Sequence, residues 1–164
     1  MTVSDFKQTY FSLHPKLYRI AFTILKNVED AEDIIQETYC KLWNSRENLS
    51  DIQNPEAYCV TLVKHSCMDL LRSPRVSMNN DSIDDFDFFD NSSSIEKDLE
   101  NKETIIKIKS IIRSLPKNQQ KILRLRGFAG CSFEEIESIT GESAVNIRVL
   151  LSRARSTIRA KLKL

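Results

Sequence analysis

Hydrophobic residues recur at helical spacing on both sides of a short polar break in the last quarter of the chain. Before the break, three apolar residues follow one another at three-residue intervals: Phe133, Ile136 and Ile139. Ser132 and Glu135 form a capping-box pair at the start of this pattern. Gly141 interrupts it, because glycine tolerates the left-handed backbone with which many helices end, and Ser143 can cap a second helix. The pattern predicts a helix-turn-helix.

The second of these helices is predicted to be amphipathic and basic. Its apolar positions are Val145, Ile147, Leu150, Leu151, Ala154 and Ile158. From Ser143 to the last residue there is no acidic side chain, and six are basic: Arg148, Arg153, Arg155, Arg159, Lys161 and Lys163. Positive charge suits phosphates, and Asn or Arg can bond base edges bidentately. A basic helix that only keeps the protein soluble is the alternative, but the capped partner helix favours DNA binding.

Three more helices are predicted in the first 72 residues. The first covers residues 4–26, with Pro15 as its one local disturbance. Asn27 can cap the second, whose apolar face consists of Val28, Ala31, Ile35, Thr38 and Leu42. The opposite face is polar and consists of Glu29, Glu32, Asp33, Gln36 and Glu37. Asn54 followed by Pro55 is a strong start signal for the third helix, which runs to about Arg72.

The chain is predicted to be all-α, with two small helical domains joined by a flexible acidic linker. Three Gly and four Pro in 164 residues, without sustained β-branched alternation, favour helices. Residues 74–94 lack helical period, although Phe86, Phe88 and Phe89 are unusual for a purely solvated tether. A helix resumes at Ile95, and Leu115-Pro116 begins another that stops at Gly127. The expected divisions are therefore 1–73, 74–94 and 95–164, with the helix-turn-helix in the last.

Charge is segregated along a chain whose overall net charge is only +1. Residues 79–103 hold nine acidic and two basic side chains, whereas residues 104–164 hold thirteen basic and four acidic ones. Such segregation matters for a polyanionic partner such as DNA. The four cysteines show no paired C-x-x-C spacing, so we expect small buried residues and neither a zinc site nor a disulfide framework. No apolar run has membrane-spanning length and no signal-peptide pattern occurs, so a cytoplasmic protein without membrane insertion is expected.

Long segments of the chain resemble the extracytoplasmic-function sigma factors of bacterial RNA polymerase. The family's region two is similar to HPKLYRIAFTILKNVEDAEDIIQETYCKLW and NPEAYCVTLVKHSCMDLLR. Its region four is similar to SLPKNQQKILRLRGFAGCSFEEIESITGESAVNIRVLLSRARSTIRAKL, including Ser-Arg-Ala-Arg at 152–155. The order of the segments, with a variable acidic linker between them, matches the family.

The resemblance implies a role for each part of region two. Asp33, Gln36 and Glu37 would bind core RNA polymerase. The helix from Pro55 to Arg72, with the loop before it, would melt and read the minus-10 promoter element. Its DNA-binding candidates are Lys64, His65, Arg72 and Arg75. His65 stands where the family usually has Asn, which leaves the base preference open. Two aromatic candidates for stacking a base, Trp43 and Tyr58, occupy helical positions that favour core packing.

For region four, the resemblance implies that the second helix reads the minus-35 element as duplex. The expected DNA-facing residues are Ser143, Asn146, Arg148, Val149, Ser152, Arg153 and Arg155. Leu150 replaces a frequently basic position, which is expected to weaken one phosphate contact. The implied partners are core RNA polymerase, promoter DNA and an anti-sigma protein, which is often membrane-anchored. No cofactor or metal is expected.

Two other classes of protein share parts of this pattern. A helix-turn-helix regulator without polymerase docking explains residues 132–160 but leaves the first domain without a purpose, and no dimerising or ligand-binding element is evident. An enzyme could use the acidic residues together with His65. Helical-bundle metal sites place Glu three residues before His, however, and neither His14 nor His65 has such a partner. The sequence therefore favours a sigma factor that is not an enzyme.

Overall fold

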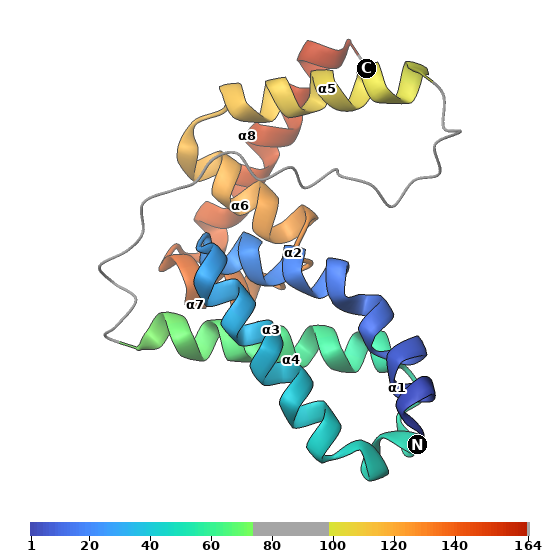
Figure 1. Cartoon of the computed structure of the whole chain (residues 1–164). Helices are drawn as coiled ribbons and strands as arrows, with labels where there is room; N and C mark the ends of the chain where they lie inside the picture. The colour runs from blue at the N-terminus through green and yellow to red at the C-terminus, as the bar shows by residue number, and fades with distance from the viewer. Residues whose placement is uncertain (74–98, 164) are drawn as a thin grey trace. The chain divides into compact units, whose positions relative to one another are not determined.

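The computed structural model describes residues 1–73 and 99–163, with side chains from residue 102 onward in the second range (Figure 1). Residues 1–73 belong to one compact unit and residues 99–163 to another. Every regular element in these two ranges is a helix, so the all-α prediction is confirmed. No helix in the described ranges is long and apolar enough to cross a lipid bilayer. The predicted linker at 74–94 and the helix start at Ile95 lie outside the described residues.

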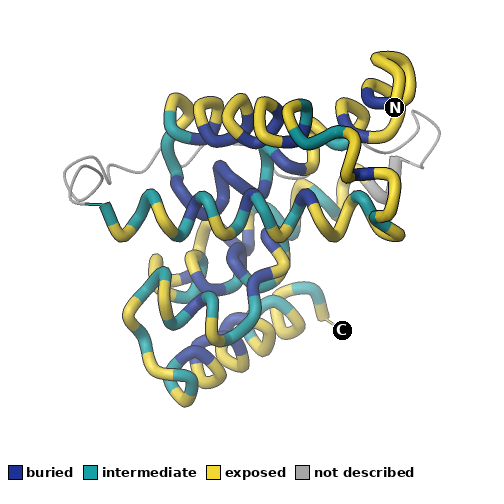
Figure 2. Tube along the Cα trace, turned by 90° about the horizontal axis from the view of Figure 1, so that it is seen from below, coloured by how far each residue is buried: buried dark blue, intermediate teal, exposed yellow. Residues whose placement is uncertain are grey.

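The first unit is built around three helices: α2 (His14–Leu25), α3 (Val28–Asn44) and α4 (Pro55–Arg72). Helix α2 packs against both of the others, and α3 also packs against α4. Their apolar stripes meet in a core of fully buried residues that includes Leu17, Phe22, Leu42 and Val63. In Figure 2 the buried positions recur along each helix between exposed ones, as amphipathic helices require.

The predicted starts of α3 and α4 are confirmed by their caps. The Asn27 side chain accepts a 3.0 Å hydrogen bond from the backbone N–H of Asp30. Asn54 does the same for the N–H of Ala57, and Pro55 occupies the first turn of α4, where its missing N–H has no helical partner to lose. A 3-10 helix, η2 (Arg46–Asp51), connects these helices.

The prediction of one helix over residues 4–26 is wrong. The segment forms α1 (Val3–Thr9), the 3-10 turn η1 (Phe11–Leu13) and then α2. Helix α1 has its own capping box, in which Thr2 and Asp5 bond reciprocally. Pro15 lies in the first turn of α2, because proline cannot donate to the preceding turn and is best accommodated at a helix start. The three-four spacing of apolar residues continued across the break and concealed it.

The second unit consists of α5 (Leu99–Ser114), α6 (Lys117–Gly127), α7 (Phe133–Thr140) and α8 (Ala144–Leu162). Helix α8 packs against each of the other three. Ile122, Leu125, Ile136 and Ile147 are almost completely buried among these helices. Helix α8 is thereby held along one buried stripe, and most of the rest of its surface is open to solvent.

The helix-turn-helix has the predicted local geometry. Ser132 and Glu135 form the capping box of α7, and Gly141 ends that helix with a φ of 75°. The Ser143 side chain accepts a hydrogen bond from the N–H of Asn146 and so caps α8. One apolar residue predicted to pack on α8 lies outside the core. Val145 is 70% exposed, because it points away from the buried stripe that contains Ile147.

The four cysteines differ in exposure, which corrects the expectation that all of them are buried. Cys59, Cys67 and Cys131 are fully buried, whereas Cys40 is exposed on α3. Burial raises the pKa of the Cys59 thiol to about 11. Cys40 lies near the C-terminal end of α3, outside the packed stripe.

These exposures predict one fast-reacting thiol. At pH 8, three units below its pKa, only about one in a thousand Cys59 side chains would be the reactive thiolate even if reagent reached it. A disulfide reagent such as DTNB should therefore label Cys40 quickly in the folded chain and all four cysteines after denaturation. Cys40→Ser should remove the fast phase. Two or more fast thiols in the native protein would contradict the packing described for the cores.

Candidate nucleic-acid and polymerase interfaces

The solvent-facing side of α8 carries most of the residues predicted to face DNA. Ser143, Arg148, Val149, Ser152, Arg153 and Arg155 are all exposed. No acidic side chain occurs between Ala144 and Leu162, so the helix presents positive charge along its length. Asn146 is half-buried, and its side-chain amide donates a hydrogen bond to the Glu142 carboxylate. The structure therefore brings all of these predicted residues except Asn146 onto an open face.

Leu150 does not belong to this face. Its side chain is only 4% exposed and lies with Leu151 and Ala154 on the buried side of α8. A basic residue at this position would have to leave the core in order to reach a phosphate. The expectation that Leu150 weakens a phosphate contact is therefore wrong, because Leu150 contributes to packing.

Three positive side chains near α8 have partners that the sequence did not reveal. The Arg148 guanidinium carbon lies 5.2 Å from the centroid of the Phe133 ring, and that of Arg126 lies 4.7 Å from the same centroid. Arg126 also donates a 2.9 Å hydrogen bond to the carbonyl of Cys131. At the other end of α8, the Lys161 ammonium is 2.9 Å from the Ser114 hydroxyl of α5. The Ser132–Glu135 pair predicts where α7 starts. No spacing in the sequence indicates that two arginine side chains contact the Phe133 ring.

The exposed side of α4 holds two of the four predicted minus-10 residues, His65 and Arg72, together with an aromatic side chain. Positions 58, 61, 65, 69 and 72 are exposed and share one helical face. His65 and Arg72 lie on this stripe, and Arg72 forms an ion pair with Asp69 at 3.4 Å. Lys64, next to His65 in the sequence, is half-buried. Tyr58 is 39% exposed, so the expected core packing of this ring is wrong. The fourth predicted residue, Arg75, lies outside the described residues.

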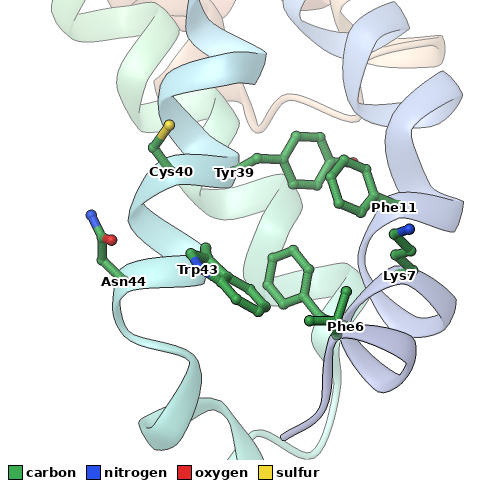
Figure 3. A pocket seen from close by; sticks show the side chains of 8 residues that line it. Phe6, Lys7, Phe11, Tyr39, Cys40, Trp43 and Asn44 are labelled. Carbon is green, nitrogen blue, oxygen red and sulfur yellow. The ribbon is translucent and has the colours of Figure 1, made fainter.

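Trp43 does pack, in an aromatic cluster formed by α1, η1 and α3 (Figure 3). Its ring meets the Phe6 ring edge-on, with 5.1 Å between the two centroids. The guanidinium carbon of Arg46 lies 4.3 Å from the centroid of the Trp43 ring. Phe11 stacks on Tyr39 at 4.7 Å. These rings border a cavity of about 420 Å³. The contacts hold the short helix α1 against α3.

The polar side of α3 has the exposure that a docking surface requires. Asp33, Gln36 and Glu37 are all exposed, and Glu37 forms an ion pair with Lys41 at 3.1 Å. On the opposite side Ala31, Ile35, Thr38 and Leu42 are buried, as predicted, but Val28 is 36% exposed because it begins the helix at the edge of the unit. Within the described residues 1–73, none of these three exposed side chains belongs to the buried core. Their removal is therefore compatible with an intact core.

The acidic side chains of α3 and His65 of α4 do not form a metal-binding group. In residues 1–73 and 99–163, no three His, Cys, Asp or Glu side chains are gathered closely enough to hold a metal ion. His65 and the acidic stripe of α3 lie on exposed faces of two different helices.

Comparison with known families gives a match for each unit. Residues 10–75 match Sigma-70 region 2, and residues 105–158 match Sigma-70 region 4. The chain belongs to the sigma-70 family. It is a transcription initiation factor of the extracytoplasmic-function type, and as such it binds core RNA polymerase and directs it to promoters.

Two proteins with similar sequences are described as RNA polymerase sigma factors. This sigma factor is 27% identical over 161 residues to the RNA polymerase sigma factor SigV of Bacillus subtilis (strain 168), a match that covers 98% of this chain and 88% of the relative. It is 28% identical over 150 residues to the probable RNA polymerase sigma factor RfaY of Xanthomonas campestris pv. campestris, covering 87% of this chain and 36% of the relative. The chain thus spans most of the first relative and about a third of the second.

Two solved structures are also similar. One is the sigma factor RpoE in complex with the anti-sigma factor NepR from Bartonella quintana, at 24% identity and a TM-score of 0.49, covering 99% of both chains. The other is CnrH in complex with the cytosolic domain of CnrY, at 17% identity and a TM-score of 0.42, covering 99% of this chain and 90% of that one. Both TM-scores lie below 0.5.

Proposed function

We propose that this sigma factor uses three exposed helix faces, each for contact with a different partner surface. Helix α8 reads the minus-35 element, α4 captures the minus-10 element, and the polar stripe of α3 docks on core RNA polymerase. The observation that carries this proposal is the pairing of regions 2 and 4 in one chain, each with an exposed polar face opposite its packed core. A regulator that only bound duplex DNA would not need the first unit.

On α8, the first turns approach base edges in the major groove and the later turns pass over the backbone, as in other helix-turn-helix docking. Arg148 and Arg153 supply guanidinium groups that can bond guanine bidentately. Asn146 and Ser152 support them, although Asn146 must exchange its bond to Glu142 for one to DNA. Arg159 and Lys163 lie further along and are suited to phosphate contacts.

On α4, the exposed ring of Tyr58 gives single-stranded DNA a surface on which a base can stack. His65 lies two turns further along the same stripe and can bond a base edge, and Arg72 and Lys64 supply positive charge for phosphates. We propose that Arg75 and the loop before α4 complete this site.

The remaining expectations follow from the role in initiation. We propose that an anti-sigma protein controls access to these faces, and that the sigma factor acts in the cytoplasm, where bacterial RNA polymerase and its promoters are found. The protein itself performs no catalysis, since the polymerase forms the phosphodiester bonds.

Co-purification with core RNA polymerase is the direct test of docking. A chain that bound promoter DNA but never core polymerase would be a regulator instead.

Arg148→Ala is predicted to cost about 1–3 kcal/mol on the preferred minus-35 sequence and little on a scrambled one. The reason is that a base contact carries sequence information. The full chain is assembled with core polymerase, and its affinity is measured for a duplex with the preferred minus-35 sequence and for a duplex with a scrambled one, each at two salt concentrations.

Arg159→Ala is the matched control for this prediction. It removes the same charge from the same helix, at an exposed position further along. It should weaken both duplexes alike and reduce the salt dependence of binding. If Arg148→Ala also weakened both equally, base reading would have to be assigned elsewhere on the second unit.

A further inference from the structure

Phe133 lies where three helices of the second unit converge. It is the first residue of α7, directly after the N-cap Ser132, whose capping box with Glu135 fixes the start of that helix. Arg126 reaches its ring from the last turn of α6, and Arg148 reaches it from the second turn of α8. The ring is half-buried, so one part belongs to the packing of α7 and another remains available to cations.

The two cations on this ring are both arginine guanidinium groups. In the part of the chain that the structure describes, neither Arg126 nor Arg148 forms an ion pair with a carboxylate. Arg126 is instead fixed by its hydrogen bond to the Cys131 carbonyl, in the loop that leads into α7. The aromatic ring attracts both cations through its quadrupole, which offsets part of their mutual repulsion.

A fixed guanidinium matters for base reading because an arginine loses much rotamer freedom when it forms a bidentate contact. Arg148 is exposed, and the Phe133 ring is the partner that the structure gives it. The contact limits the directions in which the side chain extends from α8 before DNA arrives.

We infer that Phe133 is a positioning residue for promoter recognition: its ring, held by α7 and shared with Arg126, orients Arg148 toward the base edges of the minus-35 element. This inference rests on the proposed base-reading role of Arg148. It assigns Phe133 an effect on sequence preference through Arg148 and no contact with a base of its own.

The test is a double-mutant cycle on the full chain assembled with core polymerase. Binding is measured on a duplex that carries the minus-35 sequence mapped for this sigma factor and on one in which that sequence is scrambled. Phe133→Leu keeps an apolar side chain at the start of α7 and removes the ring, while Phe133→Tyr keeps the ring. Phe133→Leu should lower the preference for the matched duplex by about three- to tenfold, in the range of a cation–π contact. Phe133→Tyr should retain it.

The Arg148→Ala background separates positioning from general packing. There, Phe133→Leu should cause no further loss of preference. An equal further loss in that background, or an unchanged preference when Phe133→Leu is made alone, would overturn the inference. If Arg148→Ala itself left the preference intact, the proposed base-reading role would fail first, and the inference with it. Phe133→Met is a second ring-free variant that keeps the same prediction should Phe133→Leu not fold.

Discussion

Replacing Asp33, Gln36 and Glu37 together with alanine should weaken binding to core RNA polymerase by about 100-fold and leave the fold intact. Polar groups that are desolvated in an interface contribute strongly, and losing their contacts costs roughly 2–5 kcal/mol. Within the free protein the same side chains are exposed, and the one ion pair among them, Glu37 with Lys41, is worth at most about 0.5 kcal/mol at 58% and 61% exposure. Affinity and thermal unfolding should therefore respond very differently.

The matched control is a triple alanine variant of Ser4, Lys7 and Gln8. These residues are also polar and exposed, and they lie on α1 of the same unit. Polymerase affinity is measured by titration with a fluorescently labelled sigma factor, and unfolding by circular dichroism. The control should bind nearly as the wild type does. Equal affinity of the α3 variant and the control would show that the docking surface lies elsewhere.

Ile147→Ala should lower the free energy of unfolding of the second unit by about 2–5 kcal/mol. The side chain is fully buried on α8, between the helices that hold the recognition helix in place, so its truncation leaves a cavity that the packing cannot fully close. For a unit of this size such a loss corresponds to a decrease in melting temperature of at least about 8 °C. Recognition of DNA should weaken with it at temperatures near the new transition.

The first unit provides an internal reference for this measurement, because Trp43 is the only tryptophan of the chain. Circular dichroism should report the shifted unfolding of the second unit, while Trp43 fluorescence should follow an unshifted transition of the first. Val145→Ala is the neighbouring control: it is 70% exposed and should change stability by less than about 0.5 kcal/mol. A small effect of Ile147→Ala, comparable to that of Val145→Ala, would contradict the described core.

Local signals in the sequence predicted the helix starts well, because capping depends on only a few adjacent residues. Asn27, Asn54, Ser132 and Ser143 all cap the helices expected of them. The break between α1 and α2 escaped prediction, since the apolar spacing ran through it and Pro15 is compatible with either a kink or a new start.

Which side of a helix faces the core could be predicted only where the apolar stripe was narrow. The polar side of α3 was predicted for that reason. Val145 and Tyr58 were misplaced because a single apolar residue at a helical position can belong to either side, and only the neighbouring helices decide. The meeting of Arg126, Phe133 and Arg148 depends on the mutual placement of α6, α7 and α8, which no spacing within one helix encodes.

Run-off transcription with purified core RNA polymerase tests the central claim most directly. The full chain should make core polymerase start at defined positions on genomic templates, and the mapped starts should share sequence elements near minus-10 and minus-35. The Asp33, Gln36 and Glu37 triple alanine variant should lose this activity, and Arg148→Ala should lose it preferentially at promoters whose minus-35 element matches best. Core polymerase that started no more selectively with the chain than without it would contradict the account.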